Sequence, residues 1–281
     1  LERSRIEAAA PDAVLHDYDA LGFRELVGTG IGRHELELEL ASRAVAAMGI
    51  REATVDPEMP VAVADRLRAD GIVLHVDDKA IAARRRAKSA PELAGVRRAQ
   101  AAAEAGMSAA AELLRRAGTD GGRLMVDGEV LTAESVRTAV RDACQARGAP
   151  APPDIIVSSP WSGFGHDPGS GPLPADLPIV IDLWPRDEES GCWADMTRTF
   201  VVGEVSEQVR AMEALVLEAI ERAREAVAPG ITGRELYDLV CDVFEPSGDR
   251  TQRTERAEDP MEGFGHGLGH GVGLALHEPP G

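Results

Sequence analysis

Near its end the chain reads Gly263-Phe-Gly-His266-Gly-Leu-Gly-His270-Gly-Val-Gly-Leu-Ala-Leu-His277-Glu278-Pro-Pro280. Three of the seven histidines of the chain fall within this stretch, among alternating glycines. Glycine lets the backbone approach a ligand closely, and imidazole can bind a metal or donate a hydrogen bond to a reacting carbonyl. A phosphate-binding loop is the alternative, but the Lys-Ser or Lys-Thr that completes a P-loop is missing. The stretch therefore favours a metal or catalytic site.

Two aspartates upstream interrupt apolar runs that we expect to be strands. Asp182 lies in the run 179–184, and Asp195 lies in the run 193–202, with polar residues between the two runs. An ionised carboxylate in an apolar strand is costly unless a positive group holds it. If the runs pair as a hairpin, both carboxylates can reach one face, where a divalent cation relieves their repulsion. The alternative is that one aspartate caps a turn and the other pairs with Arg198.

Caps and periodicity indicate how the rest of the chain is organised. A hydroxyl cap, an early proline and a glutamate at 89–92 predict the start of a long helix, and a domain boundary falls near residue 87. Helices are expected at 35–48, 91–117, 131–147, 206–227 and 232–244, and strands at 71–76, 154–158, 179–184 and 193–202. The order helix, helix, strand then occurs twice, which predicts two related halves around a shared sheet. The basic cluster 84–88 and the charged stretch 248–259 are expected to be a solvated linker and an exposed loop.

Composition excludes several classes of protein. The chain has 281 residues, 44% hydrophobic and 28% charged, with a formal net charge of −18. Such a field repels phosphate backbones and anionic lipids, so neither a nucleic acid nor a membrane is an expected partner. The first residues do not read as a secretory signal, and a cytoplasmic location is expected. Cys144, Cys192 and Cys241 are widely spaced and are expected to be reduced, packed thiols.

The ordered motifs resemble a known family. Asp182, then Asp195-Met-Thr-Arg-Thr-Phe200, then His266 to Pro280 look like the successive metal motifs of the pita-bread metallopeptidases, which include Xaa-Pro dipeptidase and aminopeptidase P. The segment 84–98 resembles the hinge before their catalytic domain. The resemblance runs from about residue 84 to the end. It implies an α+β fold, with a pita-bread catalytic domain at 87–281 that lacks its C-terminal strands. Before it, short apolar runs alternate with helical stretches, which predicts a small, incomplete α/β domain at 1–86.

The resemblance also implies a metal site. Asp182 would chelate one metal, Asp195 would bridge two metals, and His270 would bind the second. Two divalent cations are implied, with manganese as the first choice and cobalt, iron or zinc as alternatives.

The same resemblance implies substrate-binding or catalytic roles for three further histidines. His166, in the segment 162–166, and His277 would contact the substrate or stabilise the tetrahedral intermediate. His266 matches a pocket histidine of the proline-specific members.

This sequence departs from the family pattern in two respects. The usual Asp-x-Gly is Asp182-Leu-Trp184 here, and the two aspartates are 195 − 182 = 13 residues apart, which indicates a lengthened hairpin. The family also supplies two glutamate ligands after the last histidine motif, whereas this chain ends at Gly281, and Glu278 cannot replace both. We therefore expect a longer intact protein, and weak metal binding by the chain as it stands.

The implied function is hydrolysis of the peptide bond before proline in short peptides, by a homodimer. The sequence does not distinguish a dipeptidase from an aminopeptidase. Two alternatives stay open: a metal-free, creatinase-like hydrolase that uses histidine as acid and base, and a non-catalytic pita-bread module that binds a peptide or protein.

Overall fold

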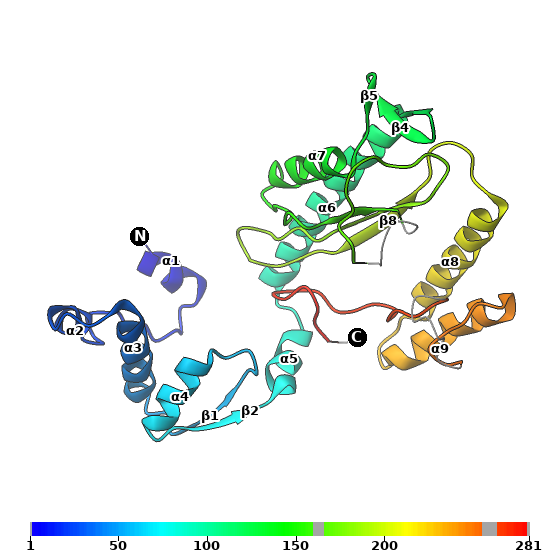
Figure 1. The fold of residues 1–281 in the computed structure, drawn as a ribbon. Helices are drawn as coiled ribbons and strands as arrows, with labels where there is room; N and C mark the ends of the chain where they lie inside the picture. The colour runs from blue at the N-terminus through cyan, green and yellow to red at the C-terminus, as the bar shows by residue number, and fades with distance from the viewer. Residues whose placement is uncertain (1, 160–165, 255–262, 280–281) are drawn as a thin grey trace. The chain divides into compact units, whose positions relative to one another are not determined.

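The chain forms two compact units. The computed structural model describes residues 2–159, 166–254 and 263–279, and the units are Leu1–Arg84 and Arg85–Gly281 (Figure 1). The division falls after residue 84, where the sequence placed it after residue 86. Part of the charged stretch 248–259 and most of the segment 162–166 lie outside the described residues. Among the helices that the structure describes, none combines the length and the apolar composition needed to cross a bilayer.

The first unit is a small α/β arrangement. Its elements are α1 (Glu2–Ala9), α2 (Phe23–Gly28), α3 (Arg33–Ala47), β1 (Glu52–Val55), α4 (Val61–Ala69), β2 (Val73–Val76) and the start of α5 (Asp78–Arg86). The strands β1 and β2 pair in parallel. The helix expected at 35–48 and the strand expected at 71–76 are both present, as α3 and β2.

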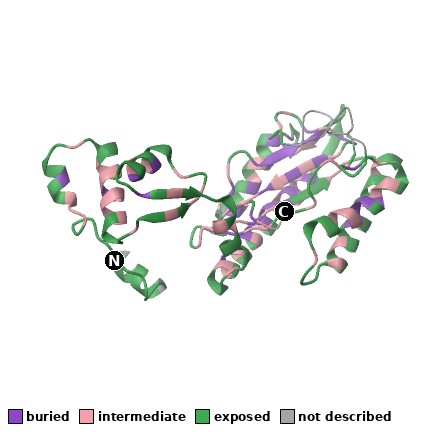
Figure 2. Cartoon of the chain, turned by 90° about the horizontal axis from the view of Figure 1, so that it is seen from below, coloured by how far each residue is buried: buried purple, intermediate pink, exposed green. Residues whose placement is uncertain are grey.

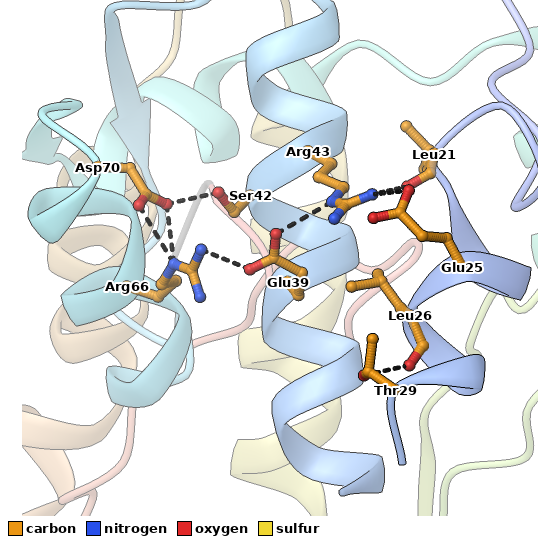
Figure 3. Close-up of polar contacts among 9 residues, drawn as sticks. All are labelled: Leu21, Glu25, Leu26, Thr29, Glu39, Ser42, Arg43, Arg66 and Asp70. Atoms are coloured by element: carbon orange, nitrogen blue, oxygen red, sulfur yellow. Dashed lines mark hydrogen bonds and ion pairs between the residues drawn. The ribbon is translucent and has the colours of Figure 1, made fainter. Parts of the chain in front are cut away.

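A polar network ties α3 and α4 together in this unit (Figure 3). Glu39 of α3 accepts hydrogen bonds from Arg43, over 3.0 Å, and from Arg66 of α4, over 2.6 Å. Arg66 also binds Asp70, and Arg43 donates to the carbonyl oxygen of Leu21. The two guanidinium groups lower the pKa of Glu39 below its usual value. This carboxylate therefore links two helices of the unit through its two arginines.

The second unit carries the expected helices and hairpin. Its elements are α6 (Ala90–Arg116), β3 (Gly118–Asp120), β4 (Arg123–Val126), β5 (Glu129–Val130), α7 (Ala133–Gln145), β6 (Ile156–Ser158), β7 (Ile179–Leu183), β8 (Met196–Phe200), α8 (Glu207–Ala226), α9 (Gly233–Phe244) and a short 3-10 turn (Glu245–Ser247). Capping boxes begin α6 at Ser89 and α9 at Thr232, and Ser206 caps α8, as predicted.

An antiparallel sheet, β6-β7-β8, separates the core from the candidate site. Ile179, Ile181 and Leu183 of β7 are fully buried in a cluster with residues of α6 and α7. Successive residues of a strand point to opposite faces, so Asp182 lies on the face away from that cluster. Figure 2 shows buried residues concentrated on these strands. One face of the sheet therefore packs against the hydrophobic core, and the other face presents polar groups.

The β7-β8 hairpin keeps one register to its tip. Asp182 pairs with Thr197 and Leu183 with Met196, and the same register continues through the bridge between Arg186 and Trp193. The lengthened connection between the two aspartates therefore consists partly of additional paired residues and partly of loop. Trp184 is half-buried and packs against the core cluster.

The tip of this hairpin is anchored to α6. Asp187 is buried, and it accepts two hydrogen bonds from Arg98 of α6, of 2.9 and 2.8 Å. Ser190 donates two more, through its backbone N–H and its hydroxyl. The anchored tip fixes the direction in which the hairpin leaves the core.

The end of the chain differs from the expected second set of strands. The described residues after α9 form no β-strand. They make two isolated β-bridges, one between Thr251 and Phe264 and one between Gly271 and Glu278. Glycine is a poor strand former, and seven of the nine residues 263–271 are glycine or histidine, the exceptions being Phe264 and Leu268. The expected repeat of helix, helix, strand is therefore complete only in the first half.

The two segments expected to be exposed linkers are exposed over most of their described residues, with exceptions. In the basic cluster, residues 84–86 end α5, whereas the side chain of Lys88 is only 12% exposed and pairs with Glu278. In the charged stretch, Thr251 is buried and Arg253 pairs with Glu245. The three cysteines are free and buried, as predicted.

Candidate metal and catalytic site

The two aspartates lie on one face of the hairpin. Asp182 sits opposite Thr197, whose hydroxyl donates to it over 2.6 Å. Asp195 precedes Thr197 by two residues, so it points to the same face. Burial raises the pKa of Asp182, and the charge of Asp195 raises it further, while Thr197 and His166 act in the opposite direction. Two carboxylates in mutual repulsion are the electrostatic condition that a cation relieves.

Two histidines complete a compact group with Asp195. Nε2 of His270 lies 3.2 Å from Oδ2 of Asp195, and the rings of His270 and His277 lie 4.3 Å apart between centroids. One ligand atom each from Asp195, His270 and His277 lie within 4.8 Å of one another, which makes this the candidate metal-binding group among the described residues. Nδ1 of His270 is 2.9 Å from the carbonyl oxygen of Gly271. If that nitrogen carries the proton, Nε2 is free to bind a metal.

The glycine-rich segment holds these histidines by backbone pairing. Gly271 and Glu278 exchange two N–H to carbonyl hydrogen bonds, of 2.7 and 2.9 Å, so His270 and His277 are brought to one end of a closed loop. A Cβ at Gly271 would lie 2.7 Å from the carbonyl oxygen of Pro279, which explains why glycine is needed there. The backbone N–H of Trp193, in the hairpin, donates to the carbonyl oxygen of Gly273 over 2.8 Å. The loop is thereby tied to the hairpin that carries Asp195.

The other end of the glycine-rich segment rests on α9. Phe264 stacks on Tyr237 and Phe244, with ring centroids 5.4 and 5.1 Å apart. Leu268 packs against the small cluster between α8 and α9. In Figure 1 the segment continues from α9 towards the beginning of α6. Aromatic contacts at one end and backbone pairing at the other fix a segment that has little secondary structure of its own.

Two more histidines extend the site. The rings of His166 and His266 meet edge to face, with centroids 6.1 Å apart, and both residues are exposed. His166 also acts electrostatically on Asp182. The structure thus brings His277, His270 and Asp195 into one compact group, and Asp182, a predicted metal ligand, lies beside Asp195 and outside that group. His166 and His266 form a separate pair, which an electrostatic effect on Asp182 connects to the site.

The sequence did not identify three residues that support this site. Thr197 could have been found from strand periodicity, because it lies two residues after Asp195 in the same expected strand. Lys88 and Glu278 gave no such signal, since a lysine in a basic cluster normally remains in solvent. Burial would raise the pKa of Glu278, but Lys88 and the N–H of Ala275 lower it below its usual value.

The donor set suits a divalent cation. Carboxylate oxygens and imidazole nitrogens are ligands for manganese, cobalt, iron and zinc. The carboxylate pair and the adjacent imidazoles lie on a partly exposed surface, where a cation and a substrate could both enter.

Comparison with known proteins decides the family. The family model for metallopeptidase family M24 matches residues 94–281. The chain belongs to metallopeptidase family M24. Membership of a metallopeptidase family implies divalent metal ions, in agreement with the donor set described above.

A curated relative of this M24 chain is an Xaa-Pro dipeptidase. It is 37% identical over 133 residues to an Xaa-Pro dipeptidase of Pyrococcus furiosus, a match that covers 47% of this chain and 34% of that protein. The match therefore spans about a third of that relative's length.

Solved structures share the fold. The prolidase of Pyrococcus horikoshii OT3 matches with a TM-score of 0.68 and 26% identity, over 85% of this chain and 63% of that one. An X-Pro aminopeptidase of Thermotoga maritima matches with a TM-score of 0.64 and 22% identity, over 86% of this chain and 63% of that one. The predicted α+β pita-bread fold is confirmed.

Proposed function

We propose that this protein hydrolyses the peptide bond before proline in short peptides, with divalent cations at Asp182, Asp195 and His270. The convergence of two carboxylates and His270 on one face of the β7-β8 hairpin carries this proposal. The Xaa-Pro dipeptidase relative supports the choice of substrate. We further propose that manganese is the metal and that residues 1–86 and 87–281 are separate domains. A homodimer remains a prediction from the family resemblance, and a cytoplasmic location remains a prediction from the sequence.

The side chains divide the chemical work as follows. A bound divalent cation would supply a Lewis acid for the scissile carbonyl and would lower the pKa of a water molecule. Asp195 interacts with both Asp182 and His270, which supports the proposal that it would be the ligand shared by two cations. Thr197 holds one oxygen of Asp182 by its hydroxyl, which leaves the other oxygen for a cation.

The exposed histidines are the groups that we propose contact the peptide. His277 lies against His270, and His166 acts electrostatically on Asp182. A protonated ring nitrogen of either could donate to the carbonyl oxygen as negative charge develops on it. His266 contacts His166 and would border the proline side of the substrate.

The proposal is tested with the intact protein. Proline release from Ala-Pro and Gly-Pro is measured with added Mn²⁺, and Mn²⁺ binding is measured by calorimetry. Asp195→Asn is expected to lower proline release on the order of 10³-fold and to weaken Mn²⁺ binding, because it removes the bridging carboxylate. Asp154→Asn, which changes an exposed aspartate near the sheet, is the matched control and should behave as the wild type.

Each other outcome points elsewhere. Hydrolysis that persists in a chelator would support the metal-free, creatinase-like alternative. Peptide binding without any release would support the binding module. Release unaffected by Asp195→Asn would refute the proposed site.

A further inference from the structure

A buried ion pair lies beneath the loop that carries His277. Nζ of Lys88 is 2.8 Å from Oε2 of Glu278, and the two side chains are only 12% and 4% exposed. The other carboxylate oxygen, Oε1, accepts the N–H of Ala275 over 2.9 Å. Lys88 directly precedes Ser89, the residue that caps α6. The pair therefore joins the beginning of the long core helix to the loop 271–278.

The loop is shaped around this pair. A Cβ on Gly273 would lie 2.7 Å from Oε2 of Glu278 and 3.0 Å from Cε of Lys88, so the pair occupies the space that a side chain at 273 would need. Gly273 is buried, and its carbonyl oxygen accepts the N–H of Trp193. The carboxylate of Glu278 therefore makes contacts inside the loop, with the N–H of Ala275 and against Gly273.

The consequence for His277 follows from its position in the chain. His277 is the neighbour of Glu278, and it is exposed, so the contacts that fix its backbone are those of Glu278. Glu278 is held on its main chain by Gly271 and on its side chain by Lys88 and Ala275. Loss of one charge of a buried pair leaves the other unpaired, and the remaining group then moves towards solvent or draws water in.

We propose that Lys88 is a positioning residue, which sets the orientation of His277 through its buried ion pair with Glu278. It does not touch the substrate. This inference rests on the proposed function for its effect on hydrolysis, but the geometric part stands apart from it. A displacement of His277 by about 1 Å would lower turnover on the order of 10²-fold.

The test uses the intact protein and four forms: wild type, Lys88→Met, the double variant Lys88→Met with Glu278→Gln, and Lys79→Met. Lys79 is the other lysine of the chain and is exposed, so it is the matched control. Selective labelling of histidine gives ring signals in NMR spectra, and the signal of His277 is assigned by its own substitution. Turnover and KM for Ala-Pro are measured with Mn²⁺, and folding is checked by tryptophan fluorescence.

In Lys88→Met we expect a shifted His277 signal and a fall in kcat on the order of 10²-fold, with KM changed less than about threefold. The double variant has no unpaired buried charge, so it should fold even if Lys88→Met does not. It should still show the shifted His277 signal and the low kcat, because the ion pair between residues 88 and 278 is absent. Lys79→Met should match the wild type.

Two results would overturn the inference: a wild-type His277 signal in Lys88→Met, or full recovery of kcat in the double variant, which would mean that the unpaired charge alone caused the loss. If the wild type itself releases no proline, the proposed function fails, and the His277 signal still decides the positioning role.

Discussion

The anchor between Asp187 and Arg98 gives a prediction whose size follows from the structure. The side chain of Asp187 is 4% exposed. Hydrogen bonds from Arg98 and then from Ser190 hold its pKa at about 2, against an ordinary value of 3.8. Each unit of difference between the folded-state and unfolded-state pKa corresponds to about 1.4 kcal/mol of stability. The ionised form of Asp187 therefore contributes about 2 kcal/mol to the stability of the second unit at neutral pH.

Asp187→Asn should remove this contribution in a pH-dependent manner. Since the folded pKa lies below the unfolded value, the wild type has the full contribution well above pH 3.8 and loses it as the pH falls from 3.8 towards 2. We expect the variant to be less stable than the wild type by about 2 kcal/mol at pH 7. The difference should shrink steadily below pH 3.8.

Urea unfolding followed by tryptophan fluorescence measures this difference. The tryptophans are Trp161, Trp184 and Trp193, which all belong to the second unit, so the signal reports that unit alone. Glu189→Gln is the matched control, because it removes a charge from the same loop at a side chain that is 80% exposed and 3.7 Å from Arg98. It should change the stability by less than about 0.5 kcal/mol. A difference for Asp187→Asn that is equally large at pH 7 and pH 2.5 would refute the reasoning.

Three further predictions concern packing and reactivity. Gly273→Ala should lower the free energy of unfolding by about 1 to 3 kcal/mol, because its Cβ meets the buried ion pair, whereas Gly267→Ala, with nothing within 4 Å, should be nearly neutral in the same urea titration. Glu39→Gln should speed amide hydrogen exchange in α3 by roughly threefold, because two arginines lose their shared carboxylate, and Glu37→Gln, from an exposed pair, should leave exchange unchanged. Cys144, whose pKa is raised by burial to about 11, should resist iodoacetamide at pH 8 until urea unfolds the chain; rapid labelling of the folded protein, read by mass spectrometry, would contradict this.

Local signals predicted the helices and the hairpin well. Ser89 with Glu92 and Thr232 with Glu235 form the capping boxes that their spacing indicates, because a cap is satisfied within four residues. The hairpin was also predictable, since two apolar runs separated by a polar segment have one obvious way to pair. From that pairing the shared face of Asp182 and Asp195 follows by strand periodicity alone.

Long-range contacts were beyond the reach of the sequence. Glu278 is 190 residues from Lys88 along the chain, and nothing local marks either as buried. The same holds for Phe264, which stacks on α9 instead of entering a strand. The glycines of 263–279 correctly indicated a backbone that approaches other groups closely. They could not show that this segment forms isolated β-bridges in place of strands.

The unbroken register of the β7-β8 ladder has a consequence for how such a hairpin can change length. Residues added or removed in matched pairs near the tip leave Asp182 opposite Thr197, so the site is insensitive to them. One unmatched residue placed between Asp182 and the tip, if absorbed by a slip of the ladder, would turn Asp195 to the opposite side of the sheet and into the packed helices. Length variation at this hairpin is therefore tolerated in even steps, and a graft or design that alters it should respect that parity.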